Sequence, residues 1–195
     1  MKPDRAQSHP AFAVANLLAL IVASHIGSAV AQAPAKKVPS GDPCTVVPLS
    51  DVRKAFPGAK PGERSTRIEK YGLTECSWKD GGGVVVFGVQ EFFGNDSAMD
   101  EAKGMSFGLV DPFKQADKRN IRYEVLSGVG LGNEAVAFIE ARDDKRGILS
   151  EGAMLTLHRG QRTLWLTSPV LPARDRAAAL KTFEVLGRIA AKRLE

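Results

Sequence analysis

Three glycines within five residues make the segment SGVGLGNEAVAF at 127–138 a candidate phosphate-binding loop. A dinucleotide-binding loop has the spacing G-x-G-x-x-G and opens a helix, whose N-terminus holds the pyrophosphate. Here the spacing is G-x-G-x-G, and the residues after it alternate as in a strand, with Val136 and Phe138 apolar. No Lys-Ser/Thr pair of a Walker loop follows the glycines. The segment therefore predicts a tight turn into a strand, and we expect no cofactor.

Histidine limits the catalytic chemistry of this chain, because Ser-His-Asp and Cys-His sites both need it beside a nucleophile. Of the three histidines, His9 and His25 lie in the export signal described below, which leaves His158. The chain has no S-x-x-K motif. A zinc site needs three or four ligands, but only one histidine remains and the two cysteines are expected to form a disulfide. Asp143-Asp144 lack the spaced oxygens and central glycine of a calcium loop. We therefore predict neither a catalytic histidine nor a metal site.

Carboxylates are the remaining route to catalysis. The candidates in or beside predicted strands are Glu91, Glu124, Glu134 and Glu140. A glycosidase needs two carboxylates that meet in space, so their spacing in the sequence does not decide the question. An outward-facing glutamate is the ordinary finding on a half-exposed sheet. A carboxylate-based envelope hydrolase is therefore an alternative function.

The first 33 residues have the order of a secretory signal peptide. Lys2 and Arg5 precede the apolar run AFAVANLLALIVA at 11–23, and Ala-Gln-Ala at 31–33 is a small-x-small cleavage site. The apolar run has 13 residues, whereas a membrane-spanning helix needs about 20. We predict cleavage near Ala33, a periplasmic or secreted protein, and no stable membrane span after cleavage. An uncleaved anchor is the alternative.

The formal net charge of +5 is small, and residues of both signs are mixed along the chain. Proteins that bind single-stranded nucleic acid combine basic grooves with stacking aromatic side chains. No basic block of this chain is interleaved with aromatic residues. We therefore expect no nucleic-acid partner.

Cys44 and Cys76 are the two cysteines of the chain. In an exported chain one such pair favours a disulfide bond, with two free buried thiols as the alternative. Cys44 does not follow a lipobox, which has an aliphatic residue, a spacer and a small residue directly before the cysteine, because Gly41, Asp42 and Pro43 stand there. The proline-rich, polar residues 34–43 predict a linker, and residues 44–195 are long enough for a single domain.

Hydrophobic periodicity predicts an α+β domain. Strands are expected at residues 84–87, 121–126 and 134–142. Ser97 and Asp100 have the spacing of a capping box before a helix, and a long C-terminal helix is expected from Pro172 to Leu194. Because no clear βαβ repeat appears, we predict an antiparallel sheet of about five to seven strands with packed helices and one disulfide.

A hairpin is predicted in EGAMLTLHRGQRTLWLTS at 151–168, with Arg159-Gly160 as its two-residue turn. This turn would pair Leu155 with Leu164 and Thr156 with Thr163. One face of the hairpin is expected in the core and carries Ala153, Leu155, Leu157, Leu164 and Leu166. The other face is a possible contact surface and carries Met154, Thr156, His158, Thr163 and Trp165. Interface centres favour tryptophan, which supports Trp165 as part of a contact surface. The alternative is that another part of the chain, such as residues 60–73, covers Trp165.

Three motifs in this order resemble a group of bacterial exported domains of unknown function, many of them envelope lipoproteins. They are DPCTVVPLSDV at 42–52, ECSW at 75–78 and GLGNEA at 130–135, followed by the hairpin and the closing helix. The resemblance implies a Cys44–Cys76 bond and a fold similar to the PsbP/Mog1-type sandwich, and it brings no catalytic residues. The chain departs from the pattern at Asn133, where aspartate is usual, and in lacking a lipobox.

These observations favour an exported, periplasmic domain that binds a partner protein or envelope component without catalysis. The alternatives are the carboxylate-based envelope hydrolase and a secreted inhibitor. An inhibitor needs a rigid exposed loop, for which residues 57–66 and 111–120 are the candidates.

Overall fold

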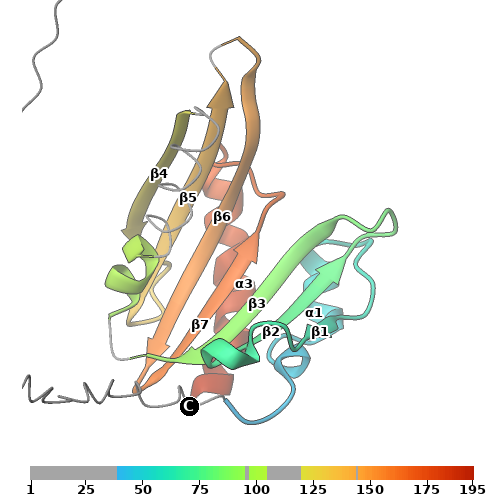
Figure 1. The fold of residues 1–195 in the computed structure, drawn as a ribbon, viewed down its shortest axis with the longest axis vertical. Helices are drawn as coiled ribbons and strands as arrows, with labels where there is room; N and C mark the ends of the chain where they lie inside the picture. The colour runs from blue at the N-terminus through green and yellow to red at the C-terminus, as the bar shows by residue number, and fades with distance from the viewer. Residues whose placement is uncertain (1–38, 95–96, 105–119, 144) are drawn as a thin grey trace, which may run out of the picture. The chain divides into compact units, whose positions relative to one another are not determined.

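The computed structural model describes residues 39–94, 97–104, 120–143 and 145–195. Seven strands form one antiparallel sheet in the order β1-β2-β3-β7-β6-β5-β4 (Figure 1). The strands are β1 (Glu63–Ser65), β2 (Leu73–Lys79), β3 (Val85–Phe93), β4 (Asn120–Ser127), β5 (Glu134–Asp143), β6 (Gly147–Arg159) and β7 (Arg162–Ser168). The helices are η1 (Pro43–Thr45), α1 (Leu49–Ala55), η2 (Glu69–Tyr71), a helical segment at 98–104 and α3 (Arg176–Leu194). The predicted α+β class is confirmed.

The main core lies between the sheet and the helices α1 and α3. Alternating strand residues point to this face, and α3 adds an apolar side at helical spacing. Its largest members are Val47, Val52, Trp78, Phe87, Leu155, Leu157, Leu164, Leu166, Phe183 and Leu186. Gly187 brings α3 close to the sheet, because a Cβ there would stand 2.8 Å from Leu155 Cδ2. Helix α3 begins at Arg176 and not at the predicted Pro172, since the Asp175 side chain caps it by accepting a bond from the Ala178 amide at 3.2 Å.

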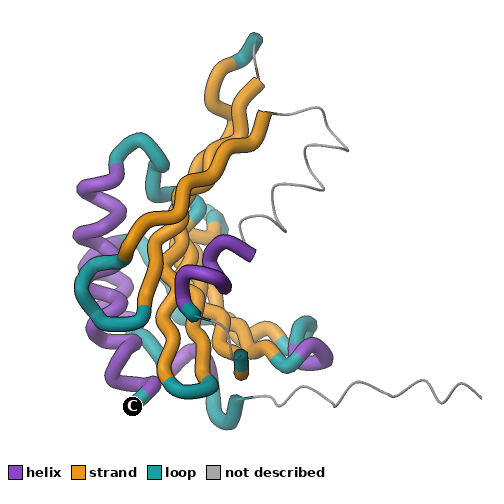
Figure 2. The backbone as a smooth tube through the Cα atoms, turned by 90° about the vertical axis from the view of Figure 1, so that its left-hand side faces the viewer, coloured by secondary structure: helices purple, strands orange, loops and turns teal. Residues whose placement is uncertain are grey.

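The opposite face of the sheet is covered in part by the helical segment 98–104, so helices lie on both sides of the sheet (Figure 2). Ser97 Oγ accepts from the Asp100 amide at 3.2 Å and donates to Asp100 Oδ2 at 2.6 Å, which confirms the predicted capping pair. The amide of Ala98 donates to Asn133 Oδ1 at 3.2 Å. The loop before β5 therefore also caps this segment.

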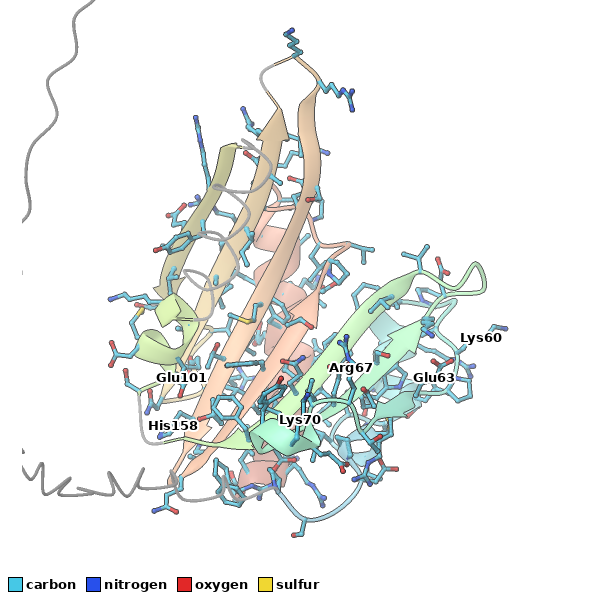
Figure 3. The ribbon with its side chains drawn as sticks, viewed as in Figure 1. Lys60, Glu63, Arg67, Lys70, Glu101 and His158 are labelled. Carbon is cyan, nitrogen blue, oxygen red and sulfur yellow. A yellow bond between two sulfur atoms is a disulfide. The ribbon has the colours of Figure 1, made fainter. Side chains whose placement is uncertain are left out.

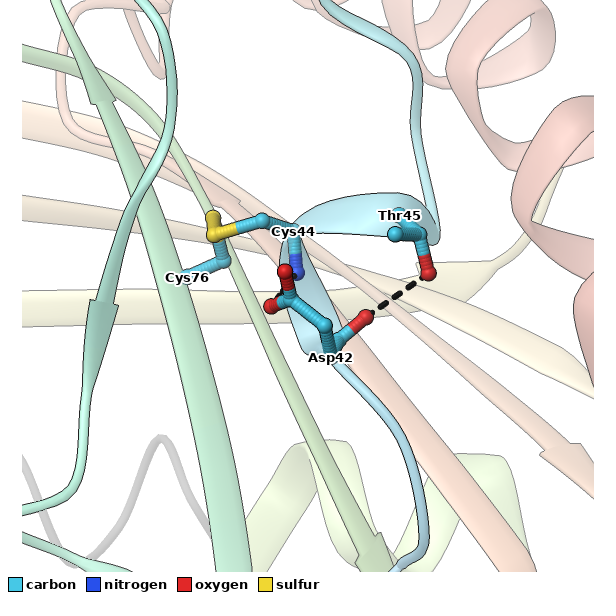
Figure 4. Close-up of a disulfide and its surroundings, with 4 residues drawn as sticks. All are labelled: Asp42, Cys44, Thr45 and Cys76. Atoms are coloured by element: carbon cyan, nitrogen blue, oxygen red, sulfur yellow. Dashed lines mark hydrogen bonds between the residues drawn. A yellow bond between two sulfur atoms is a disulfide. The ribbon is translucent and has the colours of Figure 1, made fainter.

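The predicted disulfide joins Cys44 to Cys76 (Figure 4). The short helix η1 positions Cys44, because Asp42 Oδ1 accepts from the Cys44 amide at 3.0 Å and Thr45 Oγ1 donates to the Asp42 carbonyl at 2.8 Å. Cys76 lies on the core face of β2 and is buried. Pro39 and Pro43, which fall within the predicted linker at 34–43, are buried.

The glycine-rich segment forms a turn organised by Glu134, the first residue of β5. Glu134 Oε1 accepts from the amides of Gly130 and Leu131, both at 2.7 Å. Gly130 and Gly132 have φ of 83° and 109°, a region that favours glycine. A Cβ on Gly128 would stand 2.0 Å from Glu134 Cγ. The glycines therefore give the turn its backbone conformation and leave room for the Glu134 side chain.

We expect Glu134→Ala to lower the free energy of unfolding by about 2 kcal/mol, because two hydrogen bonds to a charged group are lost. Glu134→Gln keeps an acceptor oxygen and should cost about half as much. Urea unfolding of both variants measures the difference. The control is Glu184→Ala on the exposed side of α3. An E134A protein as stable as the E184A protein would contradict this role.

The hairpin register differs from the prediction by two residues. Leu155 pairs with Leu166 and Thr156 with Trp165, because the turn consists of Gly160-Gln161 and not Arg159-Gly160. Gly160 takes the positive φ of 58° that the turn requires. Arg159 stays in β6 and donates to the carbonyls of His158 and Leu131. A shift of two residues keeps every side chain on its predicted face, so the core assignment is unaffected.

Candidate functional site

The predicted contact face of the hairpin is mostly buried. The exposed fractions of four of its residues are 2% for Met154, 0% for Thr156, 8% for His158 and 0% for Thr163. Met154 packs with Ala102 of the helical segment and with Ala135 and Ala137 of β5. These four residues of the possible contact face are therefore covered within the domain, and Met154 belongs to a second small core formed with the helical segment 98–104 and β5.

His158 and Trp165 have local partners on this face. His158 Nδ1 lies 2.8 Å from Thr163 Oγ1, its cross-strand neighbour. The Trp165 ring packs on Phe92 with the two centroids 4.5 Å apart. Trp165 is half-buried and also packs against the cluster of Ala102, Ala135, Ala137 and Met154. Trp165 Nε1 and Thr156 Oγ1 are buried and have no hydrogen-bond partner.

A hollow of about 480 Å³ lies on the α3 side of the sheet, between strands β4 and β5 and the start of α3. We call it the arginine hollow, and its lining residues are Arg122, Tyr123, Glu124, Phe138, Glu140, Ala173, Arg174 and Arg176. The strand residues meet because Arg122 is paired with Glu140 and Glu124 with Phe138 across β4 and β5. The chain from β7 into α3 then adds the other two arginines.

Three arginines face two glutamates in the lining of the arginine hollow. Arg176 forms an ion pair with Glu124, and its guanidinium lies 5.5 Å from the centroid of the Phe138 ring. Arg174 is 70% exposed and reaches Glu151 at only 3.4 Å. Arg122 is exposed and has no charged partner among the described residues. The hollow therefore offers guanidinium groups whose donors are not all used within the domain.

Two glutamates of this region face each other across neighbouring strands, and each is paired with an arginine. Glu140 of β5 stands directly opposite Glu151 of β6. Like charges in this position repel, and each has an arginine beside it: Arg142 for Glu140 and Arg174 for Glu151. The carboxylates of the hollow are therefore part of ion pairs.

The four candidate carboxylates of the sequence do not converge on one site. Glu124 and Glu140 line the arginine hollow, whereas Glu134 holds the glycine turn and Glu91 is buried in an ion pair with Arg162. Sequence reasoning missed the arginines of the hollow. The available signal was the alternation of charge on two predicted strands, at 122 and 124 and at 140 and 142, with Arg174 and Arg176 just before the closing helix.

Comparison with known proteins brought no relative: no family model, curated protein or solved structure matches this chain. Within the described ranges, no helix is long and apolar enough to cross a membrane. In the same part of the chain, no group of three or more histidine, cysteine or acidic side chains is placed to hold a metal ion.

Proposed function

We propose that this chain is an exported domain that binds an anionic group of a partner protein or envelope component in the arginine hollow, without catalysis. The observation that carries the proposal is the convergence of Arg122, Arg174 and Arg176 on one open hollow with spare hydrogen-bond donors. Guanidinium groups bind carboxylates and phosphates through two parallel hydrogen bonds. Phe138 adds an apolar floor for the body of such a ligand.

The periplasmic or secreted location is part of the same proposal. The order of the first 33 residues supports it, and so does the Cys44–Cys76 bond, because disulfides persist in oxidising compartments. The resemblance of the three motifs at 42–52, 75–78 and 130–135, in this order, to bacterial exported domains points the same way. Mass determination of the exported protein, with cleavage expected near Ala33, tests this part.

Binding is favoured over hydrolysis by the surroundings of the carboxylates. A hydrolase based on two carboxylates needs one of them to carry a proton, in an environment that differs from that of its partner. In the arginine hollow Glu124 and Glu140 each form an ion pair with an arginine, so neither stands in an apolar environment of its own. A secreted inhibitor has no comparable support, since residues 63–65 of the candidate loop at 57–66 form β1, and 111–119 lie outside the described residues.

The test compares the mature domain with the variant R122A/R174A as baits in an envelope extract. We expect a component that the unmodified domain retains and the variant loses at least about tenfold, because two cationic contacts are removed. The matched control is K60A/R67A, which removes two exposed cations near β1, at the opposite edge of the sheet from β4 (Figure 3). Equal recovery with all three baits, or turnover of a substrate in a hydrolase screen, would contradict the proposal.

A further inference from the structure

Strand β4 is a long edge of the sheet. Its eight residues, Asn120–Ser127, pair with β5 over their whole length, from Asn120 opposite Arg142 to Ser127 opposite Ala135. No described strand pairs with its other side, and Figure 1 shows β4 outermost in the sheet. An edge of this length presents a row of backbone donors and acceptors. The other edge of the sheet is β1, which has only three residues.

The sequence of β4 is complementary to itself in one antiparallel register. If two copies of β4 pair about a two-fold axis at Tyr123, Arg122 of each copy stands opposite Glu124 of the other. Opposite charges directly across a strand pair are favourable, and this register forms two such pairs. Arg122 is exposed without a charged partner among the described residues, so it is available for the contact. Tyr123, 39% exposed, would meet its symmetry mate on the other face.

We propose that the β4 edge binds a second copy of this chain and joins two seven-stranded sheets into one. Residues opposite each other in an antiparallel pair share a face, so the α3 sides of both copies lie on the same side of the joined sheet. Arg122 and Glu124 line the arginine hollow, and the hollows of the two copies therefore adjoin across the axis. Each copy contributes these residues to the neighbouring hollow. Glu124 then lies between Arg176 of its own chain and Arg122 of the second copy.

The first test measures the dimer dissociation constant of the mature protein by sedimentation equilibrium. We expect R122E to raise this constant about 10- to 30-fold, because two attractive pairs become repulsive. E124R should act in the same direction, and the double swap R122E/E124R should restore association. A protein that stays monomeric throughout the micromolar range overturns the proposal. The β4 edge would then be free to pair with an extended segment of another protein. A swap that fails to restore association overturns the register.

The second test uses cysteine cross-linking. Both natural cysteines are in the disulfide, so an introduced thiol is the only free one. Tyr123→Cys should form a dimer under mild oxidation, because directly opposite residues have a spacing that a disulfide can bridge. The control is Ser127→Cys on the same strand, which in this register lies about 27 Å along the strands from its symmetry mate. Efficient cross-linking at 127, or none at 123, overturns the proposed axis.

Discussion

Reduction of the Cys44–Cys76 bond should lower the free energy of unfolding by roughly 3.5–4 kcal/mol. The bond closes a loop with a sequence separation of 32, and a loop of this length loses that much conformational entropy in the unfolded chain. For a domain of this size the melting temperature should fall by about 10 °C. The effect is large because the bond ties η1 to the second strand of the sheet.

Thermal unfolding of the mature protein with and without reductant measures this effect. The control is C44A/C76A, whose melting temperature should not respond to reductant. Gly62 packs against the bond, since a Cβ there would stand 2.6 Å from Cys76 Sγ. Reduction is therefore performed in the unfolded protein before refolding. An unchanged melting temperature after this treatment would show that the bond does not stabilise the domain.

Loss of the Arg162 side chain is the second change with a large expected effect. Glu91 is 2% exposed, and its Oε1 accepts from Arg162 Nε at 2.9 Å. Arg162 Nη1 also donates to the Arg193 carbonyl at 3.1 Å, in the last turn of α3. The pair thus connects β3, β7 and the end of the closing helix. Arg162→Met leaves Glu91 as an uncompensated buried charge, which typically costs about 3–5 kcal/mol.

The double variant E91L/R162M separates the charge from the packing. Removing both charges should recover most of the lost stability, to within about 1 kcal/mol of the unmodified protein. Urea unfolding measures each variant, and the matched control is Arg188→Met, whose partner Glu184 lies on the exposed side of α3. That control should cost no more than about 0.5 kcal/mol. If E91L/R162M is as unstable as R162M, the buried charge is not the cause.

Local patterns in the sequence were sufficient for most of the elements. Alternation predicted β5 and the two long strands of the hairpin, and the Ser97–Asp100 spacing predicted the start of the helical segment. The cysteine pair and the export signal predicted the disulfide. The glycine spacing correctly indicated a turn. The helices, strands and turn depend on neighbours a few residues apart, where periodicity and turn chemistry act directly.

The hairpin shows where such reasoning stops. The faces of β6 and β7 follow from alternation alone, but the register depends on which residues form the turn, and Arg159 is held in β6 by the distant Leu131 carbonyl. The exposure of the second face could not be predicted either. Met154 and its neighbours alternate as a half-exposed strand does, and only the position of the helical segment 98–104 buries them.

The sequence by itself determined the class of the domain and the turn at 127–138, because each follows from the conformational preferences of nearby residues. It also predicted the disulfide, because the chain has only two cysteines and begins with an export signal. The tertiary structure alone decided which charges meet. Glu91 and Arg162 are 71 residues apart, and Glu124 and Arg176 are 52 residues apart. A charged side chain carries no local signal of its partner, since an ion pair depends on sheet order and on where a helix begins. The arginine hollow and the complementary edge of β4 are visible only once β4 is placed at the end of the sheet.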